Sequence, residues 1–197
     1  MTNEKTPRNA EATRERILEA AMAEFSAHGV AGARVDRIAK IAGCNKNLIY
    51  IYFENKETLF TTVLRKNLTR HYEELPFTLD DLPGYAVRVF DFAMSHPDLM
   101  RLLAWFGLEQ TSENPAERAI ARNAQVLALK KAQKAGQVGA AFPPDFLMIA
   151  LMALATAWTA ANPFGPSLDP EGLKRTNVLR RNISEAVRIL SEAGPVA

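Results

Sequence analysis

Residues 34–52, RVDRIAKIAGCNKNLIYIY, predict a helix, a glycine turn and a second short helix. Val35 and Ile38 stand at helical spacing on the inner face of the first helix. Gly43 can adopt the positive φ that reverses the chain sharply, and Asn45 can cap the helix that follows. This arrangement is the helix-turn-helix unit, whose second helix can lie in the major groove of DNA.

The second short helix divides into an apolar underside and an outward face. The underside consists of Cys44, Leu48 and Ile49, and the outward face consists of Lys46, Asn47, Tyr50 and Ile51. Lysine can donate to guanine acceptors, asparagine can pair with adenine, and isoleucine can contact a thymine methyl group. Lys56, at the start of the next helix, is placed to meet a phosphate. We therefore expect this helix to contact base edges.

A tight corner between two helices also occurs without DNA binding, and the charge balance leaves that alternative open. The chain has a formal net charge of +2. Residues 1–75 hold 12 basic and 10 acidic residues, whereas residues 76–197 hold 12 of each. Affinity for DNA would therefore depend on a few well-placed contacts and on dimerisation, not on a strongly basic stripe.

The 197 residues predict an all-α protein of about nine helices, because apolar residues recur at spacings of three and four between Pro and Gly breaks. After a loose arm of residues 1–10, the first helix begins near Thr13 or a few residues earlier and ends at Gly29. Another helix begins at Pro97. The remaining helices are expected over residues 35–42, 46–52, 55–74, 85–95, 114–136, 144–161 and 171–192.

The stretch from Arg14 to Lys66 resembles the N-terminal domain of TetR-type bacterial transcriptional regulators, the TetR/AcrR family. The matching groups are ILEAAMAEFSAHG, IAKIAG, KNLIYIYF and NKETLF, in that order along the chain. Beyond Lys66 the likeness is architectural only. The resemblance implies a three-helix helix-turn-helix DNA-binding domain over residues 1–58 and a helical effector-binding and dimerisation domain over residues 59–197.

The resemblance also assigns roles to single positions. It implies that the DNA-binding surface includes Arg34, Asn45, Lys46, Asn47, Leu48, Tyr50, Ile51, Tyr52 and Lys56, with Tyr50, Tyr52 and Lys56 on phosphates. Two of these positions depart from the family pattern. Asn47 replaces a residue that is commonly small. Arg34 replaces the usual Ser or Thr cap of the second helix, so we expect it to contact a phosphate or the adjacent minor groove instead.

Large, deformable apolar side chains are dense between residues 90 and 158, where pockets between helices occur. Core filling explains any one of them, but together with the resemblance they predict a site for a small apolar effector. The candidate ligand-binding residues are Phe90, Met94, Trp105, Phe106, Glu109, Met148, Met152 and Trp158.

The helix expected over residues 144–161 has one face of small residues, which include Ala150, Ala153 and Ala157. Small faces let helices approach closely. Paired with the last helix, this face predicts a four-helix interface between two copies of the chain, and hence a homodimer.

The remaining chemistry-bearing residues predict no catalytic or metal site. Cys44 is the one cysteine, and we expect it to act as a small hydrophobe rather than as a redox sensor. The histidines at 28, 71 and 96 stand too far apart for a metal motif, and no cofactor is expected. No catalytic motif is present, so we expect no enzyme. A helical protein-binding module, or an enzyme with a site in the C-terminal bundle, remains an alternative.

The sequence favours a cytoplasmic protein without a membrane span. The start of the chain lacks the apolar segment of a secretory signal. The apolar run over residues 146–161 is shorter than the roughly 20 residues that cross a bilayer. We expect a ligand-responsive repressor that binds a pseudo-palindromic double-stranded DNA operator as a dimer.

Overall fold

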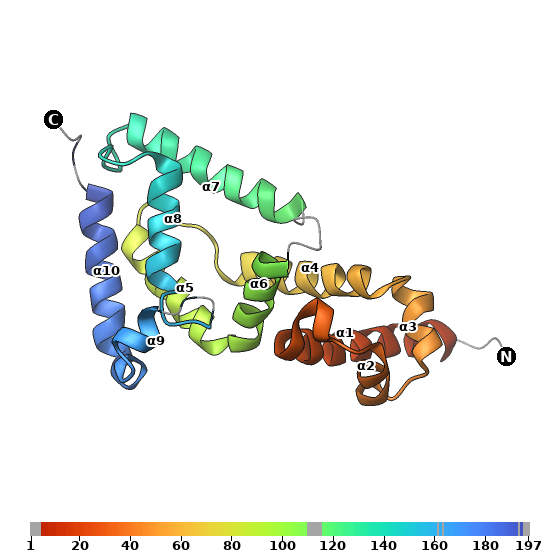
Figure 1. The fold of residues 1–197 in the computed structure, drawn as a ribbon. Coiled ribbons are helices and arrows are strands. Elements are labelled where there is room, and N and C mark those ends of the chain that lie inside the picture. The colour runs from red at the N-terminus through yellow and green to blue at the C-terminus, as the bar shows by residue number, and fades with distance from the viewer. Residues whose placement is uncertain (1–4, 110–115, 161, 163, 193, 195–197) are drawn as a thin grey trace. The chain divides into compact units, whose positions relative to one another are not determined.

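The computed structural model describes residues 5–109, 116–160, 162, 164–192 and 194, and within them it forms helices joined by turns and loops, without strands (Figure 1). It contains ten α-helices and one 3₁₀ turn within those residues. The all-α fold predicted from the sequence is therefore confirmed, with one α-helix more than expected.

The chain forms two compact units. The head unit comprises residues 1–68 and 101–115, and the core unit comprises residues 69–100 and 116–197. The head unit thus extends past the predicted domain boundary at residue 58 and includes a second, distant piece of chain. That piece could not be found from local sequence, because only packing brings it to the N-terminal helices.

The head unit contains α1 (Lys5–Gly32), α2 (Val35–Ala42), α3 (Lys46–Phe53), most of α4 (Lys56–Glu74) and the C-terminal part of α6 (Pro97–Glu109). Its α2 packs against both α1 and α3. The core side chains come from several helices and include Ile17, Phe25, Ile38, Ile49 and Phe60, all at most 2% exposed. Burial of such side chains stabilises helices as short as α2 and α3, which would be unstable alone.

The long helix α1 differs from expectation at its start and agrees near its end. Residues 5–10 are helical, so the prediction of a loose arm was wrong for them, while residues 1–4 lie outside the described part. Gly29 interrupts the helix with φ 66° and ψ −176°, a conformation that favours glycine. The predicted stop at Gly29 is therefore a break, followed by one further helical turn.

The core unit contains α5 (Leu82–Ser95), α7 (Ala116–Lys134), α8 (Pro144–Ala155), α9 (Phe164–Leu168) and α10 (Thr176–Glu192), with a 3₁₀ turn over Gly172–Arg175. α10 packs along α5 and α8, and α7 packs on α8 (Figure 1). The buried face of α10 includes Leu179, Ile183 and Val187, which stand at helical spacing.

Two helix boundaries in the core unit differ from the predicted ones. α8 ends at Ala155, although its pattern suggested residue 161, which lies outside the described residues. The hydroxyl groups of Thr156 and Thr159 donate to the carbonyls of Met152 and Thr156, at 2.7 and 2.8 Å. Such side-chain bonds compete with regular helix. The last helix begins at Thr176, because the residues expected to form its first turn form the 3₁₀ turn instead.

The described part of the chain holds neither a candidate membrane span nor a cluster of metal-ligating side chains. No helix there has both the length and the apolar character needed to cross a membrane. In the same residues, no group of three or more His, Cys, Asp and Glu side chains could hold a metal ion.

Candidate nucleic-acid interface

The turn between α2 and α3 has the geometry that the sequence predicts. Gly43 is left-handed, with φ 63° and ψ 41°, and its backbone N–H donates to the end of α2. The Asn45 side chain accepts the backbone N–H of Asn47 at 2.9 Å, which confirms Asn45 as the cap of α3. Asn55 likewise accepts the N–H of Thr58 at 2.7 Å and caps α4. These caps fix the start of two neighbouring helices.

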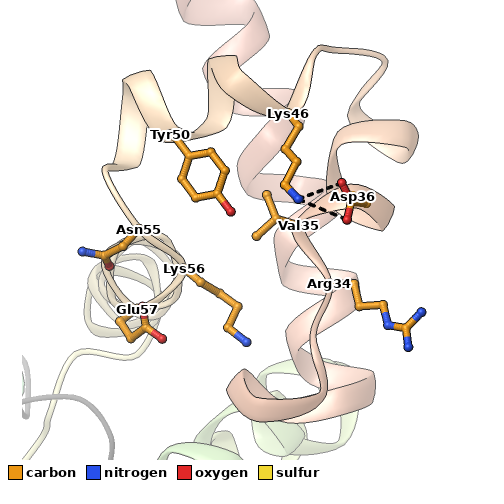
Figure 2. Close-up of a pocket in the computed structure, with 8 residues that line it drawn as sticks. All are labelled: Arg34, Val35, Asp36, Lys46, Tyr50, Asn55, Lys56 and Glu57. Carbon is orange, nitrogen blue, oxygen red and sulfur yellow. Dashed lines mark hydrogen bonds and ion pairs between the residues drawn. The ribbon is translucent and has the colours of Figure 1, made fainter.

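An open hollow of about 560 Å³ lies between the N-terminal ends of α2, α3 and α4. Figure 2 shows Tyr50 and Lys56 on one side and Arg34, Val35 and Asp36 on the other. The full lining is Arg34, Val35, Asp36, Lys46, Tyr50, Asn55, Lys56 and Glu57. Three cations face two carboxylates, and the N-terminal ends of helices add partial positive charge. The hollow is therefore suited to an anionic, hydrogen-bonding surface.

Lys46 is held by a partner that the sequence did not predict. Its Nζ lies 3.0 Å from Oδ1 and 3.2 Å from Oδ2 of Asp36, across the gap between α3 and α2 (Figure 2). The hydrogen bond and the negative charge of Asp36 raise the pKa of Lys46 above its ordinary value. Lys46 is therefore a charged donor at the mouth of the hollow, joined to Asp36 by an exposed ion pair.

The other cations of the hollow are held differently. Lys56 Nζ donates to the backbone carbonyl of Ala33 at 3.4 Å, so it reaches from α4 to the chain just before α2. The side chain of Arg34 is exposed and makes no cap on α2. The expectation that Arg34 cannot cap the helix is therefore confirmed.

The start of α2 is held instead by Glu24, a carboxylate on α1 that is 5% exposed. Its Oε1 accepts the backbone N–H of Arg34 and the Nε–H of Arg37, both at 2.8 Å. Arg37 Nη2 lies 2.6 Å from the same oxygen and also donates to the carbonyl of Gly32. Burial raises the pKa of Glu24, but the bonds from Arg37 and Arg34 and the charges of Arg37 and His28 outweigh it and lower the pKa overall.

The remaining predicted contacts lie on α3 outside the hollow. Asn47 and Ile51 are exposed one helical turn apart, and Ile51 is 75% exposed. Leu48 is half-buried. The Tyr52 hydroxyl donates to the carbonyl of Ala10 at 3.3 Å, so it anchors the start of α1. The structure thus gathers Arg34, Lys46, Tyr50 and Lys56 around the hollow and sets the other α3 residues beside it.

Cys44 lies at the turn and is half-buried. Burial raises the pKa of its thiol, and the charge of Arg16 only partly offsets this. A thiol with a raised pKa is mostly protonated at neutral pH, which makes it a poor nucleophile. The structure thus favours the interpretation of Cys44 as a packing residue.

The predicted effector-binding residues divide between the two units. Phe90, Met94, Met148, Met152 and Trp158 belong to the core unit. Phe90 is fully buried, and its ring meets that of Trp158 edge to face with centroids 6.5 Å apart. Among the described side chains, Trp158 Nε1 is a buried donor without a hydrogen-bond partner. A buried N–H of this kind is costly unless a ligand or water pairs with it.

Trp105, Phe106 and Glu109 instead belong to the head unit, where they contact α1 and α4. Glu109 accepts the backbone N–H groups of Val30 at 2.9 Å and Ala31 at 3.3 Å. Trp105 Nε1 donates to the carbonyl of Ser26 at 3.2 Å, and the ring of Phe106 stacks on Phe60. A Cβ at Gly29 would collide with both Glu109 and Trp105. The predicted ligand set is therefore not brought together in one unit.

Sequence reasoning missed Glu24 and Asp36. Glu24 stands seven residues after Ile17, on the apolar stripe of α1, so a carboxylate in that register signals a buried partner. Asp36 carries no such signal, because acidic residues are common in the first turn of any helix.

Comparison with known families supports the assignment of both units. Residues 17–63 match the model described as bacterial regulatory proteins, tetR family. Residues 81–188 match the model described as tetracyclin repressor-like, C-terminal domain. The chain therefore belongs to the TetR family of bacterial regulators.

Relatives and solved structures agree with this assignment. The HTH-type transcriptional repressor SCO4008 of Streptomyces coelicolor is 42% identical over 185 residues, which cover 92% of this chain and 96% of that protein. The repressor NicS of Pseudomonas putida is 33% identical, with 72% and 74% covered. The crystal structure of the regulator SCO4942 from S. coelicolor aligns with a TM-score of 0.77 and 32% identity, over 91% of this chain and 98% of that one.

The family fixes the class of activity. The chain is a DNA-binding transcriptional regulator, as the sequence predicted, and not an enzyme. The hollow at α2, α3 and α4 lies within residues 17–63, the segment that matches the tetR family model.

Proposed function

We propose that the protein is a ligand-responsive repressor that binds a pseudo-palindromic operator as a homodimer and is released by a small apolar effector. The observation that carries the DNA-binding part is the hollow lined by Arg34, Lys46, Tyr50 and Lys56. Lys46, Asn47 and Ile51 are the proposed base contacts, and Arg34, Tyr50 and Lys56 the proposed phosphate contacts. Leu48 and Tyr52 complete the proposed surface at its edge.

The proposed dimer interface is formed by α8 and α10 of two copies. Phe146 and Ile149 on α8 are 50% and 65% exposed, and Ile189 on α10 is 55% exposed. Such large apolar side chains favour burial against a second apolar surface. A two-fold dimer would present two recognition helices to half-sites one DNA turn apart, about 34–36 Å.

The proposed effector site lies in the core unit, around Phe90, Met94, Met148, Met152 and Trp158. The unpaired Nε1 of Trp158 supports a ligand that carries one hydrogen-bond acceptor in an otherwise apolar body. Trp105, Phe106 and Glu109 are no longer proposed as ligand contacts, because they are engaged with α1 and α4. An effector with differential affinity of about 1–3 kcal/mol would release the operator.

The decisive experiment selects bound sequences from random duplex DNA with the purified full-length protein. We expect an enriched inverted repeat bound with nanomolar affinity that falls as salt rises. A folded dimer that enriches no sequence at low salt, and from which mass spectrometry recovers no bound small molecule, would contradict the proposal. It would favour the helical protein-binding module. We expect the operator, and so the protein, in the bacterial cytoplasm.

A further inference from the structure

The N-terminal end of α2 lacks the side-chain caps that such an end ordinarily has. Arg34 stands at the cap position and makes no cap hydrogen bond. Arg37 stands three residues later, where a Glu or Gln would complete a capping box by accepting the cap residue's N–H. Arginine has no acceptor, so neither residue can satisfy the free N–H groups of the helix.

Glu24, on the neighbouring helix α1, takes the place of the Glu or Gln that is missing at position 37. It accepts the N–H of Arg34, which is the bond that a Glu at position 37 would accept in a capping box. The same oxygen accepts Arg37 twice, through Nε and Nη2. Glu24 is almost fully buried, while the side chain of Arg37 is 42% exposed, so these bonds lie at the edge of the core. One carboxylate on α1 therefore holds both the cap residue of α2, Arg34, and the residue three positions later, Arg37.

The side chain of Arg34 has no capping role on α2. A Ser or Thr at position 34 would direct its side chain back onto α2 to cap it. Glu24 holds the backbone of Arg34, whose side chain stays exposed, and Arg34 is one of the residues that line the hollow together with Lys46 and Lys56. Its guanidinium points outward from α2 in Figure 2. Five N–H donors and a permanent charge are then available for a DNA phosphate.

We propose that Glu24 is a positioning residue for DNA binding, which holds the backbone N–H of Arg34 and the side chain of Arg37 from α1 and so places Arg34 to contact a phosphate of the operator. The inference rests on the proposed operator binding and deepens it. Glu24 does not touch DNA, and its effect passes through the first turn of α2.

The test measures operator affinity, salt dependence and melting temperature for single and double variants of the full-length dimer. Glu24→Gln should weaken operator binding about tenfold at temperatures where the dimer is folded, since a charge-assisted bond is lost. The backbone N–H groups of residues 34–38 should exchange faster in this variant. Glu19→Gln, an equal charge change at an exposed site on α1, should leave affinity within about twofold.

Arg34→Thr tests whether Glu24 acts on DNA binding through Arg34, because a purely structural role of Glu24 would not change the effect of this substitution on operator affinity. Alone, it should weaken binding and reduce the salt slope by about one, because one phosphate contact is lost. In the Glu24→Gln background Arg34 is no longer held in place, so the same change should cost less than it does alone. A smaller loss of operator affinity in the Glu24→Gln background supports the proposal, whereas equal losses in both backgrounds overturn it.

Two outcomes separate the possible failures. A Glu24→Gln dimer that melts earlier but binds the operator like the wild type overturns the positioning role while leaving the proposed function intact. Wild-type protein that binds no selected sequence removes the proposed function itself. If Glu24→Gln does not fold, Arg37→Lys tests the same network from its exposed side, with an expected loss of about threefold. Unchanged binding in that variant also overturns the proposal.

Discussion

Two lysines of the head unit are held by different partners. Lys46 is the first residue of α3 and is held at the mouth of the hollow by Asp36. Lys56 begins α4 and reaches the backbone carbonyl of Ala33. A lysine on the recognition helix can read base edges, whereas one at the start of a neighbouring helix meets the sugar-phosphate backbone.

Replacement of each lysine should therefore change DNA binding in a different way. Lys46→Ala should weaken binding to the selected operator by about 5- to 150-fold, corresponding to a base contact of about 1–3 kcal/mol, with little change for unrelated DNA. Lys56→Ala should weaken binding to all sequences and reduce the salt slope by about one. Retardation of operator and scrambled duplexes at several salt concentrations measures both. A uniform loss for Lys46→Ala would contradict its base contact.

At the scale of the element, local signals located the helices around the turn well. α2 and α4 occur where the pattern placed them, and α3 is one residue longer. These helices could be located because Gly43, Asn45 and Asn55 are residue types that mark the ends of helices. The predicted end of α8 was wrong, because threonine hydroxyl groups beyond Ala155 bond to backbone carbonyls. Composition alone does not reveal these bonds.

The site was predicted less completely than the fold, and the reason is sequence distance. The α3 residues could be named because they follow each other on one short helix. Glu109 and Trp105 lie about a hundred residues into the chain, and each bonds to a partner 79 residues away in α1. The density of aromatic residues suggested that Glu109 and Trp105 belong to a ligand site. In the structure both side chains pack against Gly29 and bond to α1.

The contact of α6 with α1 predicts a loss of stability when Glu109 is removed. Glu109→Ala leaves the N–H groups of Val30 and Ala31 without their acceptor, so the free energy of unfolding should fall by about 1–3 kcal/mol. Guanidinium titration measures this change. Leu108→Ala is the matched control, because Leu108 on the same helix is 76% exposed, and it should cost less than about 0.5 kcal/mol. Equal effects of the two variants would show that Glu109 contributes nothing specific.

The whole molecule joins DNA binding to assembly. The proposed recognition of a pseudo-palindromic operator needs two heads at a fixed spacing, which a dimer would provide. The exposed apolar residues of α8 and α10 lie in the core unit, so the proposed interface is separate in sequence from the DNA-binding surface. A change in the interface should therefore leave the single head folded.

Ile149→Glu should shift the protein from dimer to monomer and lower operator affinity by at least about a hundredfold, because a buried charge opposes association and one half-site is lost. Sedimentation velocity and retardation of a full operator measure the two effects. Ile120→Glu on α7 makes the same change at another exposed apolar position, 68% exposed, and should remain dimeric. A dimeric Ile149→Glu variant would place the interface elsewhere.

The discontinuous make-up of the head unit limits how this regulator can be recombined with others. α6 contributes residues 101–109 to the head, and these supply Trp105, Phe106 and Glu109 to its α1 and α4. A chimera that joins residues 1–58 to a foreign ligand-sensing domain would discard all three anchors. Modular engineering of new sensors from this protein must therefore graft two segments at once, or redesign the foreign helix to carry the same three side chains.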